Sequence, residues 1–92
     1  MESTESVIAT IWTSELQVAQ VVPESNFFAL GGDSLLLLNV LFLVGEHFGV
    51  ELLPVTLMEN PTLREFCLRV DRERAASGGG FAVDAVNAED VA

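Results

Sequence analysis

Residues 35–45 form the longest nearly apolar run of the chain, and this run limits the folds that the chain can adopt. The segment, LLLLNVLFLVG, holds a single polar residue, Asn39. Eleven residues are too few to cross a bilayer as a helix, which needs about 20. One stripe at helical spacing suits a core: Leu37, Val40, Leu41, Val44 and Phe48. The run therefore predicts a core helix over residues 34–48, with Asp33 as its N-cap and Gly49 as its C-cap.

Two further stretches before residue 62 also have helical patterns. Apolar residues at helical spacing predict a first helix over about residues 4–18: Ile8, Ile11, Trp12 and Leu16. Residues 54–60 predict a short helix, which ends because Pro61 disfavours helical geometry in the residue before it. Between residues 20 and 33 the pattern breaks, which predicts a long loop of the kind that is usually functional. We expect Phe27, Phe28 and Leu30 to fix this loop to the core, with Trp12 and the two phenylalanines as core residues.

A capping box opens the last predicted helix, because Thr62 is followed three residues later by Glu65. Glu65 is also placed to pair with Arg69 one turn later. The core stripe of this helix consists of Leu63, Phe66, Cys67 and Val70. No stretch of useful length shows the alternation of apolar and polar residues that is typical of a β-strand. The predicted fold class is all-α: a small four-helix bundle of three main helices and a short third helix, with a long loop between the first two.

The 92 residues suffice for one small domain. Residues 75–92 are rich in Gly, Ala and acidic residues, and are predicted to be a flexible acidic tail or linker after a folded domain of residues 1–74. A domain of that size buries about 60% of its unfolded surface, so it has little room for a deep substrate cleft.

The net charge of −10 is unevenly distributed along the chain. Residues 1–61 contain eight carboxylates and no Lys or Arg, and all four arginines lie in residues 64–74. Without a basic stripe, nucleic-acid binding is excluded as a function. The acidity predicts partners with basic docking surfaces, and a solvated surface kept for solubility is the alternative.

A single cysteine, Cys67, excludes an internal disulfide and favours a reducing cytoplasm. The start MESTES is unlike a secretory signal. The predicted protein is soluble, cytoplasmic and free of membrane spans. Cys67 lies on a core stripe, where cysteine acts as a small hydrophobe.

Ser34 is the candidate functional residue, and the residues around it leave three interpretations open. Gly32-Asp33-Ser34-Leu35 resembles the nucleophile block of GDSL-type lipases and esterases, which need a base beside the serine. The only histidine, His47, lies 13 residues along the same predicted helix, or almost 20 Å away at about 1.5 Å per residue. We therefore predict no catalytic residue and no metal ligand. The other two interpretations are a plain helix N-cap and a point of covalent attachment.

The segment NFFALGGDSL, from Asn26 to Leu35, closely resembles the core motif of carrier proteins, above all the peptidyl carriers of nonribosomal peptide synthesis. The resemblance covers residues 5–72 and includes EHFGVELLPVTLMENPTLREF. It implies that Ser34 carries 4′-phosphopantetheine, installed from coenzyme A by a separate transferase, with Gly32 and Asp33 beside the attachment point. Gly31 and Gly32 would leave room for the transferase to reach the hydroxyl.

That resemblance implies a carrier and not an enzyme: an aminoacyl or peptidyl group would ride on the arm as a thioester. The alternatives are an acyl or aryl carrier of polyketide or fatty-acid type, a GDSL-like hydrolase and an unmodified helical interaction module. Implied partners are a phosphopantetheinyl transferase and adenylation, condensation, thioesterase or tailoring enzymes, with the chain itself a monomer. The face of residues 34–48 away from the core is predicted to dock them through Leu35, Leu36, Asn39, Phe42 and Leu43. The alternatives for this face are that the tail folds back over it through Phe81 and Val83, or that the chain self-associates.

Overall fold

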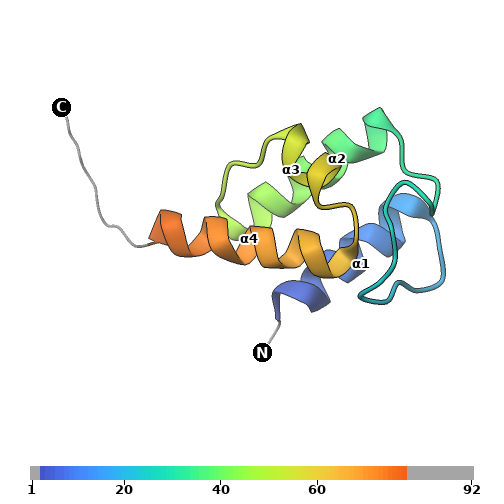
Figure 1. Ribbon diagram of the computed structural model, residues 1–92, viewed down its shortest axis with the longest axis horizontal. Helices are drawn as coiled ribbons and strands as arrows, with labels where there is room; N and C mark the ends of the chain where they lie inside the picture. The colour runs from blue at the N-terminus through green and yellow to red at the C-terminus, as the bar shows by residue number, and fades with distance from the viewer. Residues whose placement is uncertain (1–2, 79–92) are drawn as a thin grey trace.

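The chain folds into four helices in the computed structural model, which describes residues 3–78 (Figure 1). Their bounds are α1 Thr4–Leu16, α2 Ser34–Phe48, α3 Pro54–Glu59 and α4 Leu63–Gly78. Helix α1 packs against both α2 and α4, and the short α3 packs against α2 and α4. The predicted all-α bundle, with its short third helix and its long loop between the first two helices, is confirmed.

The sequence signals at the ends of α2 and α4 form the predicted caps. Asp33 Oδ1 accepts a hydrogen bond from the Leu36 N–H at 2.9 Å, and Gly49 ends α2 in the left-handed region with φ of 69°. The capping box of α4 is reciprocal, because Glu65 N–H donates to Thr62 Oγ1 at 3.2 Å and Thr62 N–H donates to Glu65 Oε1 at 3.4 Å. These local signals therefore set the start of both helices and the end of α2.

One predicted ion pair is wrong. Arg69 does not pair with Glu65; its Nε donates to Glu73 Oε2 at 3.2 Å, one turn further along α4. The carboxylate of Glu65 instead accepts the Thr62 N–H of the capping box. From the sequence, the Glu65 carboxylate could bond either to the Thr62 N–H or to Arg69. The bond to Thr62 forms within the first turn of the helix, and it is the one observed.

Trp12 occupies the centre of the core. It is fully buried, with the ring of Phe27 5.3 Å away edge-on and the ring of Phe66 6.1 Å away in a stacked arrangement. The stripe predicted on α2 is buried at Leu37, Val40, Leu41 and Val44. The prediction that Phe28 also lies in the core is wrong, because Phe28 is 40% exposed, with its ring edge-on to that of Phe27 at 5.4 Å.

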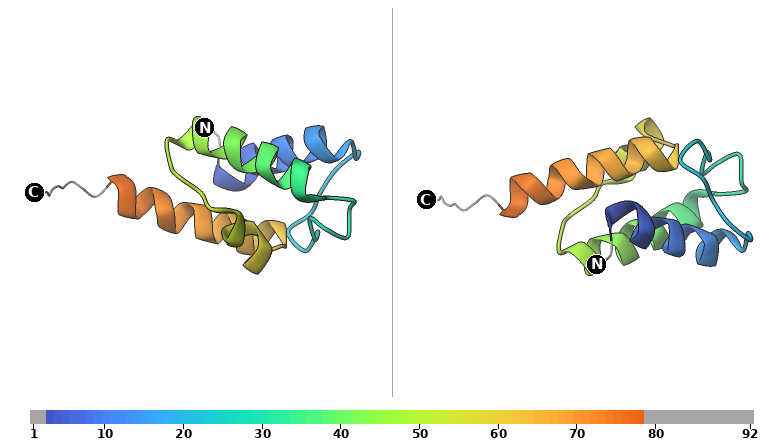
Figure 2. Two further views of the ribbon diagram at one scale, coloured as in Figure 1. Left: turned by 90° about the horizontal axis from the view of Figure 1, so that it is seen from above. Right: turned by 90° about the horizontal axis from the view of Figure 1, so that it is seen from below.

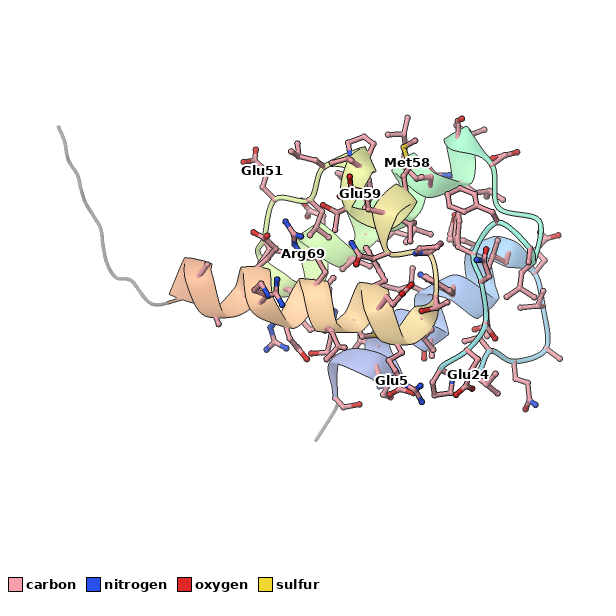
Figure 3. The ribbon with its side chains drawn as sticks, in the orientation of Figure 1. Glu5, Glu24, Glu51, Met58, Glu59 and Arg69 are labelled. Carbon is pink, nitrogen blue, oxygen red and sulfur yellow. The ribbon has the colours of Figure 1, made fainter. Side chains whose placement is uncertain are left out.

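The long loop between α1 and α2 is held by backbone hydrogen bonds to the start of α4. Phe27 N–H donates to the Pro61 carbonyl at 2.8 Å, and Leu63 N–H donates to the Ser25 carbonyl at 2.9 Å. Glu24, labelled in Figure 3, adds an exposed ion pair with Arg64 at 3.1 Å. The loop therefore closes one end of the bundle, beside the start of α2 and away from the C-terminal end of α4 (Figure 2).

At the opposite end, one arginine of α4 joins three helices. Arg74 Nη1 donates to Thr4 Oγ1 on α1 at 2.7 Å, and its guanidinium lies 4.4 Å from the centre of the Phe48 ring on α2. The Thr4 hydroxyl in turn donates to a carboxylate oxygen of Asp71. The ends of α1, α2 and α4 are thus tied together far from the long loop.

Helix α4 is longer than the sequence pattern predicts. It continues through Gly78, so Ala75–Gly78 is helical although the predicted tail begins at Ala75. Residues 79–92 lie outside the described residues, and the division into a folded domain and a flexible tail stays a prediction.

Candidate functional site

The turn that leads into α2 is built by Asn26 and two glycines. The side-chain carbonyl of Asn26 accepts hydrogen bonds from the backbone N–H groups of Phe28 at 2.9 Å and Ala29 at 3.1 Å. Gly31 then adopts a φ of +103°, which a residue with a Cβ rarely adopts. These contacts reverse the chain and direct it towards Ser34.

Gly32 lies against the backbone and the ring of Phe27. A Cβ at Gly32 would come within 2.3 Å of Phe27 Cε2 and 2.8 Å of the Phe27 carbonyl oxygen. That this glycine leaves room for a transferase stays a prediction. The structure adds an internal reason for glycine that no sequence spacing could reveal, because only the fold brings the ring to this position.

The hydroxyl of Ser34 is not used for helix capping. Ser34 is exposed and is the first residue of α2, while Asp33 supplies the cap. By contrast, Ser3 caps α1 by accepting the Ser6 N–H at 3.0 Å. Within residues 3–78, the Ser34 hydroxyl makes no hydrogen bond, so the interpretation of Ser34 as a plain N-cap is wrong.

The start of α2 supplies hydrogen-bond donors for a negatively charged group on Ser34. The N–H groups of Ser34 and Leu35 occupy the first turn of α2, where no carbonyl of the same helix can accept them. The positive end of the helix dipole lies at the same point. A phosphate ester on the Ser34 hydroxyl would therefore lie beside unpaired donors, the arrangement by which helix N-termini hold phosphate groups.

The only histidine of the chain, His47, does not lie beside this serine. His47 is in the last turn of α2 and Ser34 in its first, so their separation matches the almost 20 Å expected at about 1.5 Å per residue. Among the described residues, no group of three His, Cys, Asp or Glu side chains is arranged to hold a metal ion. No helix within residues 3–78 is long and apolar enough to cross a membrane. The geometry suits a serine that another protein modifies.

The predicted partner face of α2 is largely exposed. Leu35 is 68% exposed, Phe42 is 65% exposed, and Asn39 and Leu43 also lie at the surface. Leu36 is the exception, since it is partly buried and packs against the core. Leu36 lies one helical turn before the fully buried Val40, so its side chain is at the border between the core face and the exposed face of α2.

The apolar surface is wider than the sequence pattern predicts. Leu38 on α2 is 53% exposed, and three exposed apolar residues come from α3 and its N-cap: Leu53, Val55 and Met58. Met58, labelled in Figure 3, is 60% exposed. A groove of about 290 Å³ runs along α2 between Phe42 and the segment that leads to Pro54. We call these exposed residues of α2 and α3, with the groove, the α2–α3 face.

Cys67 is buried on the core side of α4, as predicted. Burial raises the pKa of its thiol to about 12, and the carboxylates of Glu5 and Asp71 contribute to the rise in the same direction. At pH 8 the thiolate fraction is then about one in ten thousand, and the thiolate is the reactive form.

Cys67 should therefore not react with Ellman's reagent in the folded, unmodified protein at pH 8. One thiol per chain should react in denaturant, because unfolding exposes the sulfur and restores an ordinary pKa. The released chromophore measures both rates. Rapid reaction of the folded chain at the rate of a free thiol would contradict the burial of Cys67.

Comparison with known proteins agrees with this geometry. Residues 6–70 match the family described as "Phosphopantetheine attachment site". The chain is 43% identical over 61 residues to a linear gramicidin synthase of Brevibacillus parabrevis, covering 66% of this chain and 1% of that protein. It is 37% identical over 75 residues to a phenolphthiocerol/phthiocerol polyketide synthase of Mycobacterium tuberculosis, covering 82% of this chain and 5% of that protein.

A solved structure shows the same fold. The phosphopantetheine transferase Sfp has been solved in complex with coenzyme A and a peptidyl carrier protein, and this chain matches the carrier fold with a TM-score of 0.73 and 30% identity. The match covers 78% of this chain and 94% of the solved one. The chain spans only a few per cent of the length of the two synthases that it matches. It belongs to the phosphopantetheine attachment-site family, as a non-catalytic carrier domain for 4′-phosphopantetheine of the kind found in peptide and polyketide synthases.

Proposed function

We propose that Ser34 is the attachment site, and that the chain carries an aminoacyl or peptidyl group as a thioester and presents it to successive biosynthetic enzymes. The observation that carries this proposal is the state of the Ser34 hydroxyl. It is exposed at the start of α2 and free of hydrogen bonds within residues 3–78, because Asp33 caps the helix in its place.

The chain's own residues make Ser34 accessible and stabilise its modified form. In the transfer, Ser34 Oγ bonds to the phosphorus next to the pantetheine of coenzyme A. The bond from that phosphorus to the adenosine bisphosphate portion breaks, and the hydroxyl proton goes to a base of the transferase. The N–H groups at the start of α2 would then be available to hold the phosphodiester. When bound, the cofactor supplies the thiol that holds the cargo.

We propose aminoacyl or peptidyl cargo in preference to the acyl or aryl alternative. The support is the Phe27-Phe28 pair followed by LGGDS, which resembles the peptidyl branch more than the acyl branch. Relatives of both kinds exist, because one of the matching proteins is a gramicidin synthase and another a polyketide synthase. Loading by an adenylating enzyme distinguishes the two.

The α2–α3 face is our candidate docking surface for the transferase and for adenylation, condensation, thioesterase or tailoring enzymes. It begins beside Ser34 with Leu35, so a partner bound there would have access to the attachment point. Its rim is acidic: Glu46 and Glu51 line the groove, and Glu59 lies at the end of α3 (Figure 3). An apolar centre with an acidic rim fits a partner whose apolar patch is bordered by Lys or Arg.

We also propose that the chain is a cytoplasmic monomer. One buried cysteine suits a reducing compartment, and a net charge of −10 opposes self-association. We keep the division into a carrier domain and an acidic tail, with the end of the folded part moved towards Gly78, where α4 ends.

The test is incubation of the purified chain with coenzyme A and a transferase of broad specificity, followed by intact-mass analysis. The expected result is a gain of one phosphopantetheinyl group. Cleavage after Glu24 and Glu46 releases one peptide, residues 25–46, in which tandem mass spectrometry should locate the group on Ser34. No gain of mass, or modification elsewhere, would contradict the proposal.

Replacing Leu35 or Phe42 by alanine should lower kcat/KM for modification about 3- to 10-fold, while the melting temperature changes little. Both side chains are more than half exposed, so truncation removes partner contact without opening a cavity. Leu68→Ala is the matched control, since Leu68 is 62% exposed but belongs to α4 and does not line the groove beside α2. Unchanged kcat/KM in both α2 variants would show that this face does not dock the transferase.

A further inference from the structure

We infer that Phe27 is a positioning residue for the modification of Ser34: its ring and backbone fix the turn from which Ser34 projects. This inference rests on the proposed role of Ser34. It concerns a side chain that touches neither the cofactor nor the hydroxyl, and that acts through Gly32.

The contact between Phe27 and Gly32 is close. A Cβ at Gly32 would lie 2.3 Å from one ring carbon of Phe27 and 2.4 Å from the next. The two residues are also joined through the backbone, because Gly32 N–H donates to the Phe27 carbonyl at 3.0 Å. Gly32 is followed by Asp33, which caps α2, and then by Ser34. Any movement of Gly32 is therefore passed directly to the cap and to the attachment point.

Phe27 itself is held from two other sides. Its ring is fully buried and meets the ring of Trp12 edge-on at 5.3 Å. Its N–H donates to the Pro61 carbonyl, just before α4, at 2.8 Å. Because the core and the start of α4 both fix Phe27, the turn rests on a rigid support, although its outer residues Phe28 and Ala29 are exposed.

Phe66 separates this role from ordinary core packing. It is as fully buried as Phe27 and also packs on Trp12, with its ring 6.1 Å away. It lies on α4, however, whereas the three atoms nearest to a Cβ at Gly32 all belong to Phe27. Phe27→Leu and Phe66→Leu thus remove the same atoms from two sides of one tryptophan, and only the first removes the support of the turn.

The experiment compares these two variants at a temperature at which circular dichroism shows both to be folded. Phe27→Leu should lower kcat for modification about 10-fold or more, because small displacements of a reacting group are costly. Its KM for the carrier should stay within about 2-fold, since the α2–α3 face is unchanged. Phe66→Leu should change neither constant by more than about 2-fold. Equal kcat in the two variants would overturn the inference.

Two further measurements keep the inference testable if Phe27→Leu fails to fold. Gly32→Ala retains Phe27, but the new methyl group would push the Phe27 ring away from the turn. The variant should therefore also lower kcat, with a smaller change in KM. An unchanged kcat overturns the inference. Amide hydrogen exchange at Gly32 should be faster in Phe27→Met than in Phe66→Met, because the Gly32 N–H is bonded to residue 27. The proposed function is tested separately, with the wild-type chain. If the wild-type chain is not modified on Ser34, the proposed function is wrong, whatever the variants show.

Discussion

Ser34→Ala should abolish modification completely while the helical bundle remains folded. The variant removes the hydroxyl oxygen of residue 34, and alanine has no atom that could form the phosphodiester in its place. The cap of α2 is retained, because Asp33 Oδ1 accepts the Leu36 N–H and alanine is a good helix former. Intact mass after incubation with coenzyme A and a transferase measures the first expectation, and the melting temperature, within about 2 °C of the wild type, measures the second.

Two other serines provide matched controls for this result. Ser25 lies in the same proteolytic peptide, but its hydroxyl accepts the Val22 N–H at 2.9 Å within the loop. Ser14 lies within α1 instead of at the start of a helix. Ser25→Ala and Ser14→Ala should each gain one phosphopantetheinyl group. A gain of mass in Ser34→Ala would move the attachment site to another residue.

Trp12→Ala should remove most of the stability of the domain. Truncating a fully buried tryptophan costs about 3–5 kcal/mol through lost burial and the cavity left behind. A domain of this size has a free energy of unfolding of about 4–11 kcal/mol, so the variant should be partly unfolded at 37 °C. Urea denaturation followed by circular dichroism measures the loss. A loss below about 1 kcal/mol would show that Trp12 is not the centre of the core.

Trp12→Phe should lower the free energy of unfolding much less than the difference in side-chain size suggests. The indole Nε1 is buried and has no hydrogen-bond partner among residues 3–78, which is a cost of about 1–3 kcal/mol to the wild-type protein. Phenylalanine keeps an aromatic ring between Phe27 and Phe66 and removes the unpaired donor. Equal destabilisation by Trp12→Phe and Trp12→Ala would show that the indole N–H stabilises the fold.

The features that the sequence predicted correctly depend on residues close together in the chain. Asp33 and Gly49 mark the ends of α2 because each acts on the backbone within one turn of itself. Side-chain placement in the irregular loop could not be predicted in the same way. Phe27 and Phe28 are adjacent and chemically identical, and only the packing of the loop on Trp12 decides that the first is buried and the second is half exposed.

The candidate site shows the same limit. Ser34 stands out through its motif, whereas the contribution of α3 to the α2–α3 face was missed. A six-residue helix is too short to show a period, so nothing in the sequence indicates that Val55 and Met58 face outwards. The packing of Gly32 on Phe27 depends on a loop that folds back on itself, and no spacing rule describes it.

The burial of Cys67 has a consequence for how long a cargo stays on the chain. A thioester is lost when a thiolate attacks its carbonyl carbon, so a reactive cysteine on the carrier would compete with the partner enzymes. Cys67 is the only cysteine of the chain, it faces the core side of α4, and its pKa of about 12 keeps it protonated at neutral pH. If the chain carries a thioester as proposed, its own cysteine would not intercept the cargo, and the lifetime of the loaded state would be set by water and by the partner enzymes.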